Sequence, residues 1–427
     1  ETKKGSEGKI SVSYNGSFGW QKATVLPEFL PSWEYASYYN MAMENMGRQD
    51  AYSQEQIDKY RTGSDPDNYP NINHLKWLLD SGSGFQNSHN VSVQGGSPIT
   101  KYNLSLGYRK QDGMTAETSN ERVTALFSLN SKLSNKLTLN VNMNSYFNNY
   151  KAPNGEPQSI DGMIGYSVRE APIYAGLKSD GSYGYQDNYS PEAWLASESF
   201  VNNVSRNISV AGQLIWETPL RGLTLAGKAG VSFYNSSDKS FRANTYFSPS
   251  KTVGPATLYL GSTDNTYTTL EATATYEKQI NEHNFKWLLG SSVENASNKY
   301  LSGGRNTFPN NNLYELSAGS SATASNGSSL SEYALMSFFT RLNYSWKERY
   351  LLEGNLRYDG SSRFAPGHRW GLFPSVSAGW RITEESFFKN SNLTKAIDNL
   401  KLRVSYGVLG NQNIGYYPYQ QTYSLGQ

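Results

Sequence analysis

Hydrophobic and polar residues alternate over about ten positions in many parts of the chain. In residues 207–217 the even positions are mostly apolar and the odd positions mostly polar, and the segments 270–277 and 338–346 repeat this arrangement. Because successive side chains of a β-strand point to opposite faces, such alternation predicts strands with one apolar face. We expect about 13 strands, at 10–18, 88–95, 100–110, 122–132, 137–148, 207–217, 223–233, 270–277, 284–297, 338–346, 350–359, 370–381 and 400–409.

Strand length and charge placement indicate a membrane barrel rather than a soluble sandwich. Strands of soluble sheets usually run about 5–6 residues, whereas a tilted membrane-spanning strand needs about 9–11. Charged residues in mid-strand all fall on the polar face, namely Lys228, Glu271, Arg341, Arg357 and Arg403. A basic side chain in the middle of the lipid face would cost ~2–4 kcal/mol. We therefore expect the even positions of 208–216 and 338–346 to face lipid and the odd positions to face a wet lumen.

The links between predicted strands alternate between short and long. The short links are 95–99, 133–136, 218–222, 278–283 and 347–349, and the long ones are 19–87, 111–121, 149–204, 235–264, 298–334 and 360–369. Outer-membrane barrels have short periplasmic turns and long extracellular loops, so we expect an antiparallel up-and-down order. The link 382–399 is longer than its place on the short side predicts, and Glu384–Lys389 is expected to form a helical turn there.

Six aromatic residues fall near the short-link ends of these strands. They are Trp216, Tyr276, Trp287, Tyr344, Trp346 and Trp380. Tyr and Trp concentrate where a membrane meets water. We expect these six residues to form an interfacial girdle.

Composition fits a protein with two solvents, lipid outside and water inside. Only 37% of residues are hydrophobic and mean hydropathy is −0.63, yet 14% are aromatic, with 32 Tyr. A solvated β-solenoid is the alternative. No segment approaches the ~18 consecutive apolar residues of a spanning helix, so any crossing must use strands. A net charge of +2 gives no sign of nucleic-acid binding. Because the chain has no cysteine, the sequence does not indicate whether the protein works in an oxidising or a reducing compartment.

The odd number of strands predicts a partial barrel. Single-chain bacterial barrels close with an even number, and an open edge is not viable in lipid. We therefore expect further strands after Gln427. The chain opens on Glu1 with no apolar leader, so we expect a fragment or a processed form.

The residues offer no support for enzyme chemistry, a cofactor or a metal. His74, His89, His283 and His368 are scattered, with no paired metal ligands beside them in sequence, and we expect surface histidines. Glycine-rich segments such as Gly304-Arg305-Asn306 lack the lysine and helix of a phosphate loop.

The long link 149–204 is the candidate substrate site, because aromatic faces stack on sugar rings. It holds Tyr174, Tyr183, Tyr185, Tyr189 and Trp194. Tyrosine-rich surface loops without a ligand are the alternative. Residues 33–46 show helical spacing (Trp33, Ala36, Tyr39-Asn40, Met43), which predicts a short amphipathic helix packed on the loop side.

Two neighbouring motifs stand out, namely the block Arg357-Tyr358-Asp359-Gly360-Ser361-Ser362-Arg363-Phe364 and the strand at residues 371–381. They resemble the R-x-D-G-S-S-R-F motif and the F-P-S-x-S-x-G-W-R strand of SusC/RagA-type TonB-dependent transporters. Residues 400–407, 410–413 and 89–96 match further family segments in the same order. Asp359, Arg363 and Arg369 are candidates for an ion-pair network, although we favour a structural staple of the loop.

The resemblance implies a barrel of about 22 strands with a plugged lumen. Residues 1–8 would then be the tail of the plug domain and 9–427 the N-terminal part of the transmembrane barrel. The family imports oligosaccharides or peptides across the bacterial outer membrane, energised by TonB through the plug, with a SusD-like surface lipoprotein as partner. A surface adhesin or binding barrel without transport is the alternative function.

Overall fold

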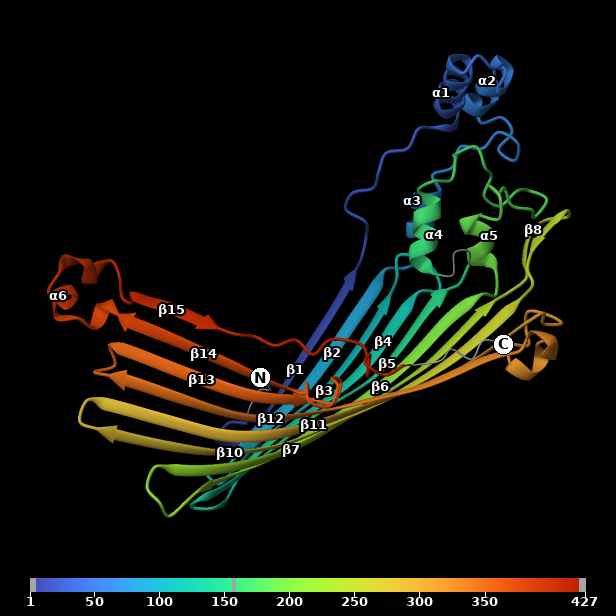
Figure 1. Cartoon of the computed structure of the whole chain (residues 1–427). Coiled ribbons are helices and arrows are strands. Elements are labelled where there is room, and N and C mark those ends of the chain that lie inside the picture. Colours follow the sequence, from blue (N-terminus) through green and yellow to red (C-terminus); the bar gives the residue numbers. More distant parts are fainter. Residues whose placement is uncertain (1–4, 156–158, 422–427) are drawn as a thin grey trace.

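A single curved sheet dominates the computed structural model, which describes residues 5–155 and 159–421 (Figure 1). Its 13 strands follow the order of the chain, every neighbouring pair is antiparallel, and a separate hairpin, β8–β9, lies in the link between β7 and β10. The antiparallel up-and-down fold is therefore confirmed. The strands are β1 (Gly8–Trp20), β2 (Phe85–Gly96), β3 (Thr100–Asp112), β4 (Ser119–Ser134), β5 (Leu137–Pro153), β6 (Phe200–Glu217), β7 (Leu223–Arg242), β8 (Thr245–Ser248), β9 (Lys251–Val253), β10 (Thr257–Ile280), β11 (His283–Asn306), β12 (Ser325–Trp346), β13 (Tyr350–Ser361), β14 (Trp370–Arg381) and β15 (Lys401–Gly407).

Short helices occupy the links. They are α1 (Ser32–Asn45), α2 (Gln54–Thr62), α3 (His74–Asp80), α4 (Ile160–Ser167), α5 (Pro191–Ala196) and α6 (Ser386–Lys389), with 3-10 turns at Leu316–Ala318, Ser321–Thr323, Ile382–Glu384 and Asn392–Lys395. The helix expected at 33–46 and the helical turn expected at 384–389 are both present. Among the described residues, no helix combines the length and the apolar character that crossing a membrane would need.

The middle strands are longer than the hydrophobic pattern predicts. Strands β10 and β11 each run 24 residues, so much of the expected loops 235–264 and 298–334 is in fact strand. The pattern missed these extensions because beyond the lipid neither face of a strand has to be apolar. The links at the loop-bearing end are correspondingly shorter, at 243–256 and 307–324.

Tight turns set the register at the opposite end. Asn281 between β10 and β11, and Lys347 and Glu348 between β12 and β13, all have positive φ, as central residues of tight hairpin turns often do. In the β6–β7 turn, Gly222 has φ +89° and lies so close to the Glu277 carbonyl that a Cβ atom would stand 2.2 Å from that oxygen. A side chain at this position would force the two hairpins apart.

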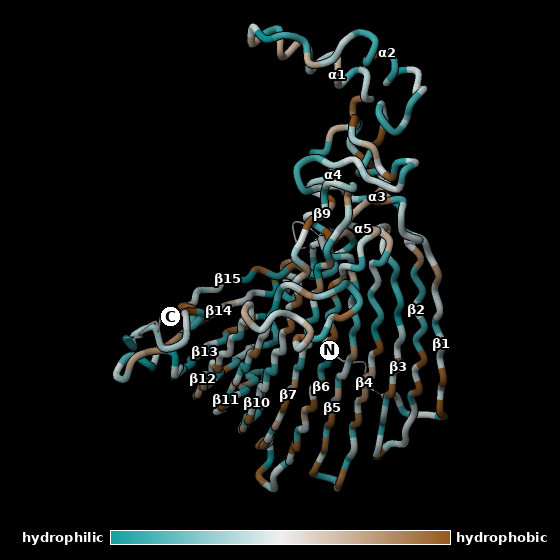
Figure 2. The backbone as a smooth tube through the Cα atoms, turned by 90° about the vertical axis from the view of Figure 1, so that its right-hand side faces the viewer, coloured by the Kyte–Doolittle hydropathy of each residue, from teal (hydrophilic) through white to brown (hydrophobic). Residues whose placement is uncertain are grey.

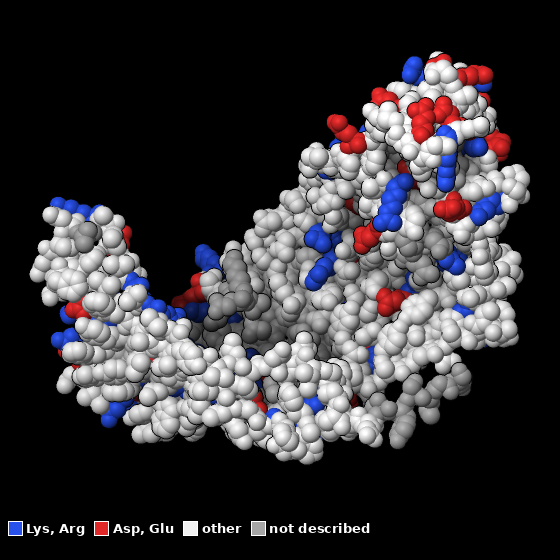
Figure 3. Space-filling view, turned by 45° about the horizontal axis from the view of Figure 1, so that its top comes forward, with Lys and Arg blue, Asp and Glu red and all other residues white. Residues whose placement is uncertain are grey.

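The register separates the strands into one apolar and one polar face. Leu342 is paired with Trp287 and Gly354 on the first face. On the second, one row crosses the sheet through Gln213, Lys228, Glu271, Ser292, Ser337 and Asp359. Figure 2 shows hydropathy alternating along the strands in this way. The predicted division of the faces is confirmed, and charged side chains lie inside the hollow of the sheet (Figure 3).

The sheet has the shape of a trough with two edges, β1 and β15. Helices α1–α5 gather beyond one end of the strands, and the link with α6 lies at the other end (Figure 1). The buried apolar clusters lie largely at the loop-bearing end, in and beneath those links. Within the described part of the chain, no second layer packs against the apolar face of the sheet, which suits a surface solvated by lipid.

Candidate functional site at the loop-bearing end

Three links meet beyond the loop-bearing end of the sheet, and we call their described residues the loop layer. They are 21–84 with α1–α3, 154–199 with α4 and α5, and 243–256 with the β8–β9 hairpin. Backbone hydrogen bonds join them: Ile72 donates to Pro172 (3.1 Å), and Tyr183 donates to Phe247 (2.7 Å). The three links therefore form one packed body.

The outer part of the loop layer is a pair of helices, α1 and α2. A capping box at Ser53 and Gln56 starts α2, and Gly63 in the left-handed conformation ends it. Ala36 of α1 is buried against Ile57 and Tyr60 of α2. The helix expected at 33–46 thus packs on the loop side, as predicted.

A second apolar cluster connects the three links closer to the sheet. Leu78 of α3, Met163 of α4 and Trp194 of α5 are fully buried in it, together with Phe247 of β8. The Trp194 and Phe247 rings meet edge to face, with centroids 5.9 Å apart. This cluster fixes the positions of the predicted aromatic site residues.

Those five aromatic residues divide into two groups. Trp194 and Tyr189 are buried, and their polar atoms are used internally: Trp194 Nε1 donates to the Asn188 carbonyl (3.2 Å), and the Tyr189 hydroxyl donates to the Met163 carbonyl (2.5 Å). Trp194 is completely buried and packs in the core, whereas Tyr189 also lines a small pocket beside Glu170, and substrate contact by either ring stays a prediction. Tyr174, Tyr183 and Tyr185 are half-buried, and substrate contact by these three stays a prediction.

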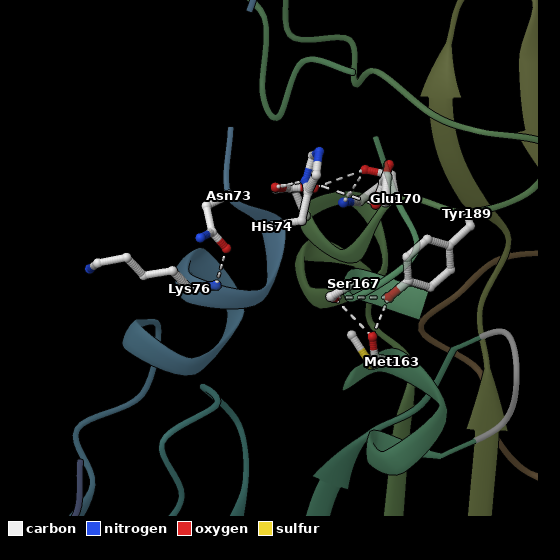
Figure 4. Close-up of polar contacts among 10 residues, drawn as sticks. Asn73, His74, Lys76, Met163, Ser167, Glu170 and Tyr189 are labelled. Atoms are coloured by element: carbon white, nitrogen blue, oxygen red, sulfur yellow. Dashed lines mark hydrogen bonds and ion pairs between the residues drawn. The ribbon is translucent and has the colours of Figure 1, made fainter. Parts of the chain in front are cut away.

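A buried polar cluster lies beside this core, and Figure 4 shows it. His74 Nδ1, at the start of α3, lies 2.9 Å from Oε1 of Glu192 in α5 and 3.8 Å from Oε2 of Glu170, which follows α4. His74 is only 2% exposed, so the expectation of a surface histidine is wrong at this position. The sequence signal was the spacing of His74 and Leu78, which puts both on the apolar face of a helix capped by Asn73.

The other histidines differ from His74. His89 lies in β2, with Nδ1 2.8 Å from the Tyr14 hydroxyl, and His283 lies in β11, with Nδ1 2.8 Å from the Tyr344 hydroxyl. His368 is exposed in the β13–β14 link.

The polar face of the sheet carries a connected set of side chains near the short links. Arg341 Nε donates to Asn355 (2.7 Å), and Asn343 and Asn355 both donate to the Glu353 carboxylate. A polar hollow of about 620 Å³ opens here, and Lys286, Lys401 and Arg403 also line it. Such a wall can contact another polar body inside the lumen.

The 357–364 motif staples the β13–β14 link. Asp359 pairs with Arg357 (3.1 Å), not with Arg363 or Arg369 as the expected network would require. Arg369 Nε donates to the Phe364 carbonyl, and Ser362 exchanges hydrogen bonds with Ala334 of β12. The guanidinium of Arg363 lies between the Tyr333 and Tyr416 rings, 4.4 and 4.6 Å from their centroids, and donates to the Ile414 carbonyl. The remaining motif positions, Gly360 and Ser361, are the buried end of β13.

The six expected girdle residues lie near the strand ends on the short-link side of the sheet, where Trp380 adjoins the longer 382–400 link. Their side chains range from half-buried to exposed, the most exposed being Trp287, Trp216 and Trp346. Trp380 Nε1 and the Tyr350 hydroxyl donate to Glu385 in the 382–400 link. These hydrogen bonds, that of Tyr350 first, hold the pKa of Glu385 below its usual range. The membrane-interface role of the six residues stays a prediction.

Comparisons with known proteins agree with this architecture. A family model described as "TonB dependent receptor-like, beta-barrel" matches residues 160–426. TonB-dependent receptor P3 of Formosa agariphila is 27% identical over 97% of this chain and 40% of its own length. TonB-dependent receptor SusC of Bacteroides thetaiotaomicron is 28% identical over 97% of this chain and 41% of its own. The chain therefore spans about 40% of the length of these relatives.

A solved structure, "Structure of the RagAB peptide transporter", shares the fold. It superposes with a TM-score of 0.78 at 23% identity, covering 98% of this chain and 49% of that one. Together with the likeness to SusC, the family match confirms the resemblance that the motifs indicate.

Proposed function

Since the chain belongs to the TonB-dependent receptor-like β-barrel family of outer-membrane proteins, we propose that the complete protein imports large nutrients through a plugged barrel, energised by TonB. The observation that carries this proposal is the meander sheet with one apolar face and one face of paired charges. An apolar exterior suits lipid, and a charged interior suits a wet lumen. The relatives are named as receptors and a transporter rather than as enzymes.

The proposed domain division has residues 1–8 as the tail of the plug and 9–427 as the N-terminal part of the barrel. Residues 1–4 lie outside the described residues, and β1 begins at Gly8. Strands β1 and β15 each have one unpaired side, and unpaired backbone groups are costly in lipid. Further strands that pair with these two edges would remove that cost. The polar hollow around Glu353 and Arg403 is the proposed contact surface for the plug.

The proposed partner is a SusD-like surface lipoprotein that sits on the loop layer. This layer is large, helical and rigidly packed at its base, which suits a docking surface. Oligosaccharides or peptides are the proposed cargo, and Tyr174, Tyr183 and Tyr185 are the aromatic rings that could contact it. The alternative of a non-transporting adhesin shares the strand architecture, but the family match favours import.

Uptake by the intact cell tests this proposal. The gene for the complete protein would be deleted from its host, and the loss of oligosaccharides and of peptides from the medium followed by mass spectrometry. We expect one class of solute to persist in the medium of the deletion strain, and its uptake to return with the wild-type gene and to stop with a protonophore. Uptake of every solute at the wild-type rate would contradict the proposal.

A further inference from the structure

The cluster of His74, Glu170 and Glu192 joins segments that are far apart in sequence. His74 begins α3 in the 21–84 link, whereas Glu170 and Glu192 belong to the 154–199 link. All three residues are at least nine-tenths buried, and one nitrogen or oxygen atom from each lies within 4.8 Å of the others. Three ligand atoms thus converge on one point between two loops.

Polar atoms in this cluster lack partners within the described protein. Neither carboxylate oxygen of Glu170 has a hydrogen-bond partner there, and Oε2 of Glu170 lies 3.8 Å from His74 Nδ1. A carboxyl group that is at least nine-tenths buried and has no hydrogen-bond partner is costly in a protein interior. A cation at this point would remove the cost.

The ligand set identifies the class of cation. Calcium and magnesium prefer sites made entirely of oxygen atoms, whereas imidazole together with carboxylates suits zinc. Zinc bonds of about 2.0–2.2 Å in a tetrahedron place neighbouring ligand atoms roughly 3.3 Å apart. The distances from His74 Nδ1 to the two carboxylates, 2.9 and 3.8 Å, lie on either side of that value.

We propose that His74 Nδ1, Glu170 and Glu192 bind a zinc ion that clamps the 21–84 link to the 154–199 link. Three protein ligands leave the fourth position to water. A pocket of about 320 Å³ beside Glu170, which Arg169, Asp187 and Tyr189 also line, provides an entry path. Ser190 Oγ lies 3.3 Å from Oε2 of Glu192 and orients that carboxylate.

The clamp stabilises the base of the helical arm formed by α1 and α2. The 21–84 link already contacts the second link at two places, because the Ile72 N–H, just before His74, and the Ser32 hydroxyl, at the start of α1, both donate to the Pro172 carbonyl. Zinc at His74 would add the strongest connection between the two links. Zinc binding would therefore limit the motion of the arm relative to the loop-bearing end of the sheet, independently of which cargo the protein takes.

Metal titration of the full-length protein in detergent tests the site. The protein is stripped with EDTA and titrated with zinc chloride, while metal content and hydrogen exchange of residues 72–80 are measured. We expect saturable binding of one zinc ion per chain and slower exchange in 72–80, with no such effect from calcium or magnesium at the same concentration. Absence of saturable zinc binding, or an equal effect of calcium, would overturn the proposal.

Matched variants distinguish a carboxylate that binds the metal from a carboxyl group that is only buried. Glu170→Gln keeps the shape of a neutral carboxyl group but removes a ligand, so we expect zinc affinity to fall at least about 100-fold. Glu198→Gln makes the same change at an exposed position of the same link and should bind zinc like the wild type. Heat-modifiable gel mobility checks that both variants fold. Unchanged zinc affinity in folded Glu170→Gln would overturn the site, and the zinc response of the wild type is decisive even if that variant fails to fold.

Discussion

Nδ1 of His74 lies 2.9 Å from Oε1 of Glu192, a residue 118 positions further along the chain. This buried contact is one of several direct polar links between the first long connection of the sheet and the third. It shows that the loop layer is an organised body rather than a set of independent loops. The following predictions test this body and the sheet that supports it.

The metal-free loop layer should become less stable as pH rises. The pKa of Glu170 is raised from 4.5 to about 9 in the folded protein. Between these values the folded state holds a proton that the unfolded loop releases, so stability decreases with increasing pH. His74, Glu192, Arg169 and Asp187 surround this carboxyl group, and comparison with Glu170→Gln isolates its share. Hydrogen exchange of 160–196 after EDTA treatment should quicken with pH in the wild type and less in the variant. An equal pH response in both would exclude Glu170 as the cause.

The two faces of β12 should respond oppositely to a new arginine. Leu342 is 50% exposed on the apolar face, and Leu342→Arg would place a charge in lipid at a cost of ~2–4 kcal/mol. Asn343→Arg puts the same side chain on the polar face, within reach of Glu353, and should be tolerated. The yield of each full-length variant in the outer-membrane fraction measures the difference. Equal yields would mean that the assigned facing is wrong.

Trp194 should support the loop layer but not the barrel. It is completely buried among α3, α4 and β8, so Trp194→Ala should destabilise the layer by ~3–5 kcal/mol. We expect rapid proteolysis within 154–199 while heat-modifiable mobility of the barrel persists. Tyr185→Ala, at a half-buried ring, is the control and should resist protease much better. Similar protease resistance of Trp194→Ala and the wild type would contradict the packing role.

Arg363 should hold the segment after β15 against the β12–β13 hairpin. Removing its guanidinium loses contacts with two tyrosine rings and the hydrogen bond to Ile414. An exposed cation–π contact contributes about 0.5–1 kcal/mol, so Arg363→Ala should increase hydrogen exchange of 410–420 severalfold. Arg369→Ala removes a hydrogen bond to Phe364 instead and should leave that segment unchanged. Equal exchange in both variants would show that Arg363 does not anchor the segment.

The sequence predicted the sheet well because lipid and water impose opposite demands on successive side chains. Alternation located the strands around Leu214 and Leu342, and the charges at Lys228 and Arg341 identified the polar face. Outside the membrane this constraint disappears, so residues 257–264 of β10 and 298–306 of β11 were mistaken for loops.

The candidate site was less predictable, since it depends on contacts between distant segments. Residue type suggested ring stacking for Trp194 and Tyr189, and it gave no sign that Trp194 is completely buried between the links or that Tyr189 is almost so. The partners of His74 come from another link, and no local sequence pattern predicts these contacts. Family motifs located the β13–β14 staple, whereas the pairing of Asp359 with Arg357 needed the geometry.

Refolding of the isolated 427-residue chain into detergent micelles tests most directly whether this sheet is part of a larger barrel. Strands β1 and β15 would leave rows of unpaired N–H and C=O groups in an apolar environment. We expect aggregates or heterogeneous oligomers by size-exclusion chromatography, and no heat-modifiable monomer on gels. A monodisperse, heat-modifiable monomer would mean that the strands present close on themselves, which would contradict the account of a partial transporter barrel.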